Sequence, residues 1–274
     1  MSKIVIPNLQ KEKIEKFLDK EAKRFDGRNA TDHREILVED NISPAASSAI
    51  RVKVGKTEVL AGVHLTPTTP YADSPDQGTF MTTAELHPIA SQQFDSGKPS
   101  INAIELGRII DRGIRESGFI DFKELCIEPG EKVWQVFLDI VAINDDGNLL
   151  DVAGIASLIA LGRARMPAYN KEDGTAEHEF VDEPIPLNKE AMSLNITLHK
   201  IGQTITVDVN KEEEAISKLR LSIAIGDNNG KPRITAMQKG KSGTINSKDM
   251  ESILKIVQGK WLELFPKVKE YAFG

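Results

Sequence analysis

Alternating apolar and polar residues predict strands in the first third of the chain. Residues 50–54 (IRVKV) alternate apolar with basic side chains, and Gly55 with Lys56 can form a hairpin turn into a second strand, TEVLAGVHL. The stretch 66–78 carries three prolines, so we expect a loop there, followed by a third strand over 79–86. The first half of the chain therefore begins with a strand-rich segment.

Four other segments are expected to be helices, the first two because their apolar residues lie at helical spacing. They are 11–25, 102–118, 149–166 and 247–264. In the second of these, Asn102 with Glu105 three residues later resembles a capping box. The third is apolar on nearly every side and rich in small residues, so we expect it to be the buried helix of the first half.

The second half of the chain repeats the order of strands followed by a helix. A mostly apolar segment over 133–143 is typical of a central strand and completes the first set. Four shorter strands, expected before the last helix, are 194–200, 204–208, 219–225 and 233–238. Two sheet-and-helix units in one chain indicate an α+β fold with duplicated β-α units, in which two mixed sheets pack against helices.

This pattern divides the 274 residues into four parts. We expect a helical extension over 1–30 and a first subdomain over 31–166. A polar linker with several prolines is expected over 167–190, and a second subdomain over 191–274.

Composition narrows the class of protein. Apolar residues make up 40% and charged residues 28%, as in ordinary globular domains. No apolar stretch approaches the roughly 18–20 residues of a membrane helix, and the N-terminus lacks a signal-peptide core, so we expect a cytoplasmic protein without membrane contact. The single cysteine, Cys126, excludes an intrachain disulfide, and we expect it to be a small buried residue. The five histidines lack zinc-ligand spacing, so the sequence indicates neither a metal nor another cofactor.

Three arginines form a stripe on the predicted helix over 102–118. Arg108, Arg112 and Arg115 lie four and three residues apart, within an arc of roughly 60° at about 100° per residue. The net charge of the chain is −6, so general basicity does not explain the stripe, and guanidinium groups suit phosphate. Acids at helical spacing leave a second interpretation open, a solvated face of salt bridges. These acids are Glu105, Asp111 and Glu116.

Other candidate chemistry is weaker. The acidic pairs and runs at 145–146, 182–183 and 212–214 are typical of turns or solvated faces. No nucleophile elbow, Walker or dinucleotide-binding pattern is present, and KGKSGTI (239–245) lacks Walker spacing, so we expect a hairpin or helix entry there. Aromatic residues make up only 5%, so we expect any RNA contact to be electrostatic and directed at phosphates.

Three stretches together resemble the RNase PH family of phosphorolytic 3′ exoribonucleases. The first combines RFDGR (24–28) and Arg34 with SSAIRVKVGKTEVLAGVH. The second is AIELGRIIDRGIRESG with IEPGEKVWQVFLDI, and the third is VDVNKEEEAISKLRLSIAI with ITAMQKGKSGTI. The resemblance spans residues 20–265 and implies the RNase PH-like fold, which is α+β with duplicated β-α units. It also implies assembly into six-membered rings around an RNA-conducting pore.

Within this resemblance the chain departs from the active members at two positions. Active members hold phosphate with Gly-Ser-Arg or Gly-Thr-Arg at the start of the apolar helix, where this chain has Gly-Asn-Leu at 147–149. Active members also carry a D-x-N motif at the end of a strand, then an acidic pair, and then a catalytic aspartate. In this chain residues 208–210 match the D-x-N motif and residues 213–214 match the acidic pair, but Arg220 stands where the catalytic aspartate is expected. Leucine cannot hold the attacking phosphate, and a guanidinium cannot act as the acid or as a metal-binding carboxylate. The resemblance therefore implies no catalytic residue in this chain.

The sequence segments IELGRIIDRGIR and LCIEPGEKVW, with the long N-terminal helix, resemble the catalytically inactive RNase PH-like ring subunit of the archaeal exosome. This implies that the chain alternates with an active RNase PH-like paralogue in a hetero-hexameric ring, a trimer of dimers. It also implies two further kinds of partner, RNA-binding cap proteins and single-stranded RNA. It implies RNA contacts for Arg108 and Arg112. Arg115 is a further RNA-binding candidate, supported only by its helical spacing from these two arginines. The expected function is that of a non-catalytic subunit in 3′-to-5′ phosphorolytic degradation of RNA.

Two rival interpretations stay open. One is an active phosphate-dependent 3′-to-5′ exoribonuclease that uses Asp208 or a residue of 212–214 in a shifted alignment. The other is a small-molecule enzyme that shares only the β-α architecture. A phosphate-binding glycine loop would distinguish that enzyme, and none is convincing here.

Overall fold

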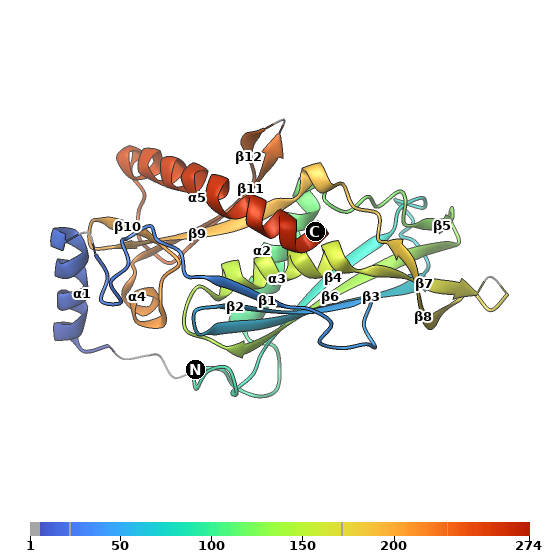
Figure 1. Cartoon of the computed structure of the whole chain (residues 1–274), viewed down its shortest axis with the longest axis horizontal. Coiled ribbons are helices and arrows are strands. Elements are labelled where there is room, and N and C mark those ends of the chain that lie inside the picture. The colour runs from blue at the N-terminus through green and yellow to red at the C-terminus, as the bar shows by residue number, and fades with distance from the viewer. Residues whose placement is uncertain (1–5, 22, 171, 229) are drawn as a thin grey trace.

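A computed structural model describes residues 6–21, 23–170, 172–228 and 230–274, and in this part of the chain two large sheets and a two-stranded one are accompanied by helices packed between and beside the large sheets (Figure 1). The first sheet has six strands, in the order β1-β2-β3-β6-β4, with β5 paired to β6. Its strands are β1 (Ile36–Glu39), β2 (Ser48–Val54), β3 (Thr57–Thr68), β4 (Thr79–Leu86), β5 (Cys126–Glu128) and β6 (Lys132–Asn144). β4 and β6 run parallel and the other pairs are antiparallel, so the sheet is mixed, as expected.

Side-chain alternation determines which face of this sheet is buried. Buried residues alternate with half-exposed ones along β2 and β3, and Val52 and Val59 are completely buried. β6 lies between β3 and β4 and contributes Leu138 to the same core. The helices α2 (Ile101–Ser117) and α3 (Leu149–Arg163) pack against this sheet.

The second sheet has four strands in the order β10-β9-β11-β12. All of its pairs are antiparallel, so the expectation of a mixed sheet is wrong for this unit. Its elements are β9 (Ser193–Ile201), β10 (Thr204–Val207), β11 (Leu219–Asn228), β12 (Lys231–Gly240), α4 (Lys211–Ile216) and α5 (Ser247–Phe273). α5 continues across Pro266, beyond its expected end at residue 264, because Val268 and Ala272 stay buried. Gly162 of α3 leaves room for Ala272, since a side chain at residue 162 would overlap it.

α3 is shared by both units. Every residue from 151 to 161 is buried, and the helix contacts β2 and β3 of the first sheet, β9 of the second sheet, and α5. The expectation of a buried apolar helix is confirmed. The helix ends at Arg163 rather than at residue 166, because Arg165 begins β7 (Arg165–Asn170).

The segment 167–190, expected as a linker, contains a β-hairpin. β7 pairs with β8 (Thr175–Pro184), and a 3-10 turn follows at Lys189–Ala191. The pairing shifts register on both sides of Pro167, which accommodates a residue without a backbone N–H. The hairpin projects from the right-hand end of the molecule in Figure 1. Its prolines therefore obscured two strands in the sequence pattern.

The N-terminal extension forms a single helix, α1 (Asn8–Glu21), against the second unit. Its buried side chains, Ile14 and Leu18, pack with Ile201 and Val209 in a small separate core. The helix begins and ends earlier than the expected 11–25. Ala22 and residues 1–5, which belong to the expected helix and extension, lie outside the described residues.

The N-terminal cap expected for α2 is wrong, whereas its expected C-terminal end is confirmed. Ser100 is the N-cap, because its hydroxyl accepts the Ala103 N–H, and Asn102 lies inside the helix. Gly118 ends the helix in the left-handed conformation, as its position predicts.

Two further expectations differ from the structure. β3 extends into the expected loop and pairs with β6 through Pro67. The pairing of β3 with β2 reaches only to Val63, so the proline lies where one side of the strand is unpaired with β2. Cys126 lies in β5 and is only partly buried.

Candidate nucleic-acid interface

A cleft of about 570 Å³ lies where the first turn of α3 meets α2, α4 and the second sheet. Its charged lining residues are Glu105, Asp145, Lys211, Glu214, Arg220 and Lys241. Leu149 and Arg220, the two departures from active RNase PH members, both line this cleft. The structure thus brings together two positions that are far apart in the sequence.

The cations of the cleft are bound by oxygens of the chain itself. Lys211 Nζ lies 3.3 Å from an Asp145 carboxylate oxygen. Arg220 Nη2 lies 2.5 Å from Glu105 Oε1, and Lys241 donates to a carbonyl of α4. Asp145 belongs to the turn between β6 and α3, as expected, but its carboxylate faces the cleft rather than bulk solvent. These pairings leave each of the three cations neutralised or hydrogen-bonded internally.

The carboxylate of Glu214 lies at the N-terminal end of α3, the kind of position where helices bind anions. Its Oε2 accepts the backbone N–H of Asn148 at 3.2 Å. Burial raises the pKa of Glu214, and the neighbouring Asp145 carboxylate raises it further. The expectation of a solvated acidic run at 212–214 is therefore wrong for Glu214, and also for the buried Glu213. An internal carboxylate occupies the helix end.

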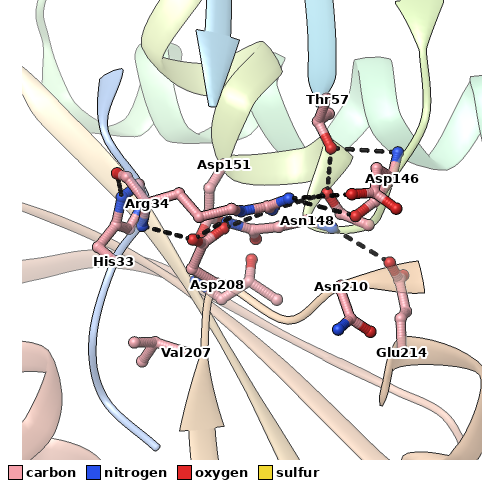
Figure 2. A network of polar contacts seen from close by, with 12 residues as sticks. His33, Arg34, Thr57, Asp146, Asn148, Asp151, Val207, Asp208, Asn210 and Glu214 are labelled. Carbon is pink, nitrogen blue, oxygen red and sulfur yellow. Dashed lines mark hydrogen bonds and ion pairs between the residues drawn. The ribbon is translucent and has the colours of Figure 1, made fainter. Parts of the chain in front are cut away.

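Beside the cleft, Asp208 is the centre of a buried polar network (Figure 2). Its carboxylate accepts hydrogen bonds from the guanidinium of Arg28 at 2.8 Å and from that of Arg34 at 2.7 and 2.9 Å. The backbone N–H of Arg34 and the side-chain amide of Asn148 also donate to it, at 2.8 and 2.9 Å. Burial alone would raise the pKa of Asp208, but the hydrogen bonds and charge of Arg34 hold that pKa well below its usual value. Asp208 is therefore a structural anion.

Arg24 anchors the N-terminal extension to the second unit. Its side chain is completely buried and forms a bidentate pair with Glu213, in which Nε lies 2.9 Å from Oε1. It also donates to the carbonyls of Val207 and Asp208, at 3.1 and 2.8 Å. Sequence analysis missed this role, because Glu213 lies 189 residues further along the chain.

A second buried carboxyl, Asp151, lies in the first turn of α3 (Figure 2). Its Oδ2 accepts the Thr197 N–H at 2.8 Å, which joins α3 to β9. Its Oδ1 and the Oδ1 of Asn148 are buried without a hydrogen-bond partner in the described part of the chain. Burial raises the pKa of Asp151 to about 7, against the lowering effect of the Thr197 hydrogen bond. Asp151 therefore titrates near neutral pH.

The predicted arginine stripe divides into two kinds of residue. Arg115 is bound within the chain, since it pairs with Asp111 at 3.0 Å and donates to the Phe80 carbonyl at 2.9 Å. Its guanidinium also lies 5.7 Å from the ring centres of Phe80 and Phe122. The salt-bridge interpretation is confirmed for this arginine.

Arg108 and Arg112 are exposed, and neither has a carboxylate partner within the ranges that the structure describes. Arg112 Nη1 donates to Gln238 Oε1 on β12 at 3.2 Å. Glu105, a possible partner of Arg108, instead pairs with Arg220. The opposite face of α2 is buried as predicted, through Leu106, Ile110 and Ile114. The helix therefore presents two guanidinium groups to solvent.

Two other features are absent from the described residues. No group of three or more His, Cys, Asp or Glu residues there is placed to hold a metal ion. No helix there combines the length and apolar character needed to cross a membrane.

Two family models match the chain in succession. The model of the 3′ exoribonuclease family, domain 1, matches residues 32–167, and that of domain 2 matches residues 192–258. The exosome complex component Rrp42 of Methanosarcina mazei is 41% identical over 235 residues, which cover 86% of this chain and 84% of that protein. The Rrp42 component of Thermococcus onnurineus is 37% identical over 251 residues, or 92% of this chain and 91% of that protein.

Solved structures show the same architecture. A chain of the Archaeoglobus fulgidus exosome with RNA bound to the active site has a TM-score of 0.83 and 34% identity, covering 94% of this chain and 98% of that chain. A chain of an archaeal exosome core has a TM-score of 0.80 and 31% identity, covering 96% of this chain and 97% of that chain. The RNase PH-like fold implied by the sequence motifs is confirmed.

Proposed function

The chain belongs to the 3′ exoribonuclease family of RNase PH, and on that premise we propose that it is a non-catalytic ring subunit of an archaeal exosome. In this proposal it alternates with an active RNase PH-like paralogue in a hetero-hexamer, a trimer of dimers. The complex acts in the cytoplasm on single-stranded RNA and carries RNA-binding cap proteins. The relatives named as exosome components and the similarity to chains of archaeal exosome cores support this assignment.

The chemistry of the cleft carries the non-catalytic part of the proposal. Phosphorolysis requires a cation that holds the attacking phosphate and an acid that assists the leaving group. Where the phosphate-holding cation is expected, the cleft has Leu149. Where the acid is expected, it has Arg220, which is paired with Glu105. The family membership also disfavours a small-molecule enzyme that shares only the architecture.

Of the acids on which the rival active enzyme would depend, Asp208, Glu213 and Glu214 are already engaged, and Glu212 is exposed outside the cleft lining. Asp208 is buried and accepts hydrogen bonds from Arg28, Arg34 and Asn148. Glu214 accepts the N–H at the start of α3. Neither carboxylate is free to take part in proton transfer to a substrate.

The exposed arginines of α2 supply the RNA-binding part. Arg108 and Arg112 are cationic, solvent-exposed and free of carboxylate partners among the described residues, so they suit backbone phosphates. Arg115 takes part less directly, because its guanidinium already binds Asp111 and Phe80. The chain thus positions RNA, and the paralogue orients phosphate and supplies the acid.

The proposal is tested by measuring nucleoside diphosphate release from poly(A) in inorganic phosphate. Three samples are compared: this chain alone, the active paralogue alone, and the complex of both. We expect no release by this chain alone, and faster release by the complex than by the paralogue. A complex whose paralogue lacks its catalytic acid is the control and should be inactive. Phosphate-dependent release by this chain alone would overturn the proposal.

A further inference from the structure

We propose that Arg220 keeps Arg108 available for RNA by binding Glu105, the carboxylate that would otherwise neutralise Arg108. This inference rests on the proposed RNA contact and adds a positioning residue to it. Arg220 itself lies in the cleft, with only 13% of its side chain exposed, whereas Arg108 is on the exposed face of α2. The two arginines therefore have separate tasks.

Glu105 has two possible cationic partners, one on its own helix and one on the second sheet. Glu105 and Arg108 are three residues apart on α2, a spacing at which side chains of opposite charge pair. Arg220 approaches Glu105 from β11, and its Nη2 lies 2.5 Å from Glu105 Oε1. The carboxylate is thus directed away from Arg108 and toward the second sheet.

The chain provides a specific space for the Arg220 guanidinium. Gly240, the β12 residue opposite Arg220, has no side chain to obstruct it. A Cβ at residue 240 would lie only 2.6 Å from Arg220 Nη2 and 2.7 Å from Cζ and Nε. The guanidinium therefore occupies the space that a side chain at residue 240 would fill, so packing as well as the ion pair determines its position.

Asp111, a second acid on α2, is engaged in a similar way. It lies three residues after Arg108, yet it pairs with Arg115 at 3.0 Å. Arg115 in turn is held by the Phe80 carbonyl. Arg220 and Arg115 thus bind the two acids of α2 that lie within reach of Arg108. Arg108 and Arg112, the arginines proposed to bind RNA, remain without carboxylate partners in the described ranges.

The experiment measures binding of a fluorescent single-stranded oligoadenylate by the complex of this chain with its active paralogue, at several salt concentrations. Arg220→Gln should weaken binding about two- to five-fold at low salt and reduce the salt slope, because freed Glu105 pairs with Arg108. Adding Glu105→Gln to Arg220→Gln should restore both values. Arg220→Lys, which retains a partner for Glu105, should bind almost as the unmodified chain does. Arg220→Met is measured in parallel, since its unbranched side chain fills much of the same space.

A double-mutant cycle separates the indirect role from direct contact. In the Arg108→Ala background, Arg220→Gln should cause no further loss of affinity, because the residue that Glu105 would neutralise is gone. A further loss in that background would overturn the inference and assign RNA contact to Arg220 itself. The inference also fails if Arg108→Ala weakens binding while Arg220→Gln and Arg220→Met do not. If Arg108→Ala itself has no effect, the proposed RNA contact fails instead.

Discussion

The chain uses arginine in two contrasting ways, which the regions around Asp208 and on the exposed face of α2 illustrate. Near Asp208, Arg24, Arg28 and Arg34 are buried or nearly so, and each is paired with a carboxylate. On α2, Arg108 and Arg112 are exposed, and no carboxylate among the described residues pairs with them. The first group joins the N-terminal segment to the second unit, and the second group remains available for a ligand. The residues with which the fold pairs each acid, rather than the spacing of the arginines, make the difference.

Loss of the central acid of the buried group should have the largest effect. Asp208→Ala leaves the guanidinium groups of Arg28 and Arg34 without the buried carboxylate that they share. We expect the free energy of unfolding to fall by about 3–5 kcal/mol, because breaking a buried ion pair leaves an uncompensated charge. Denaturant unfolding measures this change.

Asp146→Ala is the matched control, because Asp146 also pairs with Arg34, at 3.7 Å, but is more exposed. Its removal should cost less than about 1 kcal/mol. Similar losses for the two variants would contradict the contrast between buried and exposed ion pairs.

The buried acid Asp151 predicts a pH dependence of stability. Its pKa rises from 3.8 to about 7 on folding, so the folded chain binds a proton that the unfolded chain releases. This contribution to stability is complete below about pH 4, falls as the pH rises toward 7 and is lost above that pH. Asp151→Asn avoids the loss and retains an oxygen for the Thr197 N–H, so it should stabilise the chain by at most about 4 kcal/mol near and above pH 7.

The measurement is denaturant unfolding at a series of pH values from 4 to 8. Asp76→Asn, an exposed change in the loop after β3, is the control and should show no comparable trend. A difference between Asp151→Asn and the unmodified chain that does not vary with pH would contradict a raised pKa at Asp151.

Arg115 should behave as a structural residue on the face proposed to bind RNA. Arg115→Ala removes the Phe80 hydrogen bond and the ring contacts, and we expect a stability loss of about 1–2 kcal/mol. RNA affinity should change less than about two-fold, because this guanidinium is already engaged. Arg115→Lys retains the charge and should recover only part of the stability. A reduction in salt slope as large as that of Arg108→Ala would instead place Arg115 with the RNA-binding arginines.

Most of the regular structure could be predicted from local patterns. The spacing of apolar residues indicated the main strands, and α3 was evident because almost all of its residues are apolar. Prolines obscured the β7–β8 hairpin, and the polar composition of residues 211–216 obscured the short helix α4. These elements depend on tertiary contacts rather than on local periodicity.

The candidate site could be predicted only in part. The arginine stripe followed from spacing, but the choice between salt bridges and free guanidinium groups depended on Arg220, which lies 115 residues from Glu105. The inward orientation of Glu213 followed from Arg24, whose position near the N-terminus gave no local signal. Partners brought together by the fold therefore decided each case.

The most direct test of the account is the salt dependence of single-stranded RNA binding by the complex that carries Arg108→Ala and Arg112→Ala together. The slope of log affinity against log salt should decrease in magnitude by about 1.4, because two phosphate contacts are lost, while the unfolding temperature of the chain stays unchanged. Lys255→Ala with Lys267→Ala, two exposed cations on α5, is the charge-matched control and should leave the slope as it is. An unchanged slope together with a lower unfolding temperature in the arginine variant would contradict the account and make the arginine face structural.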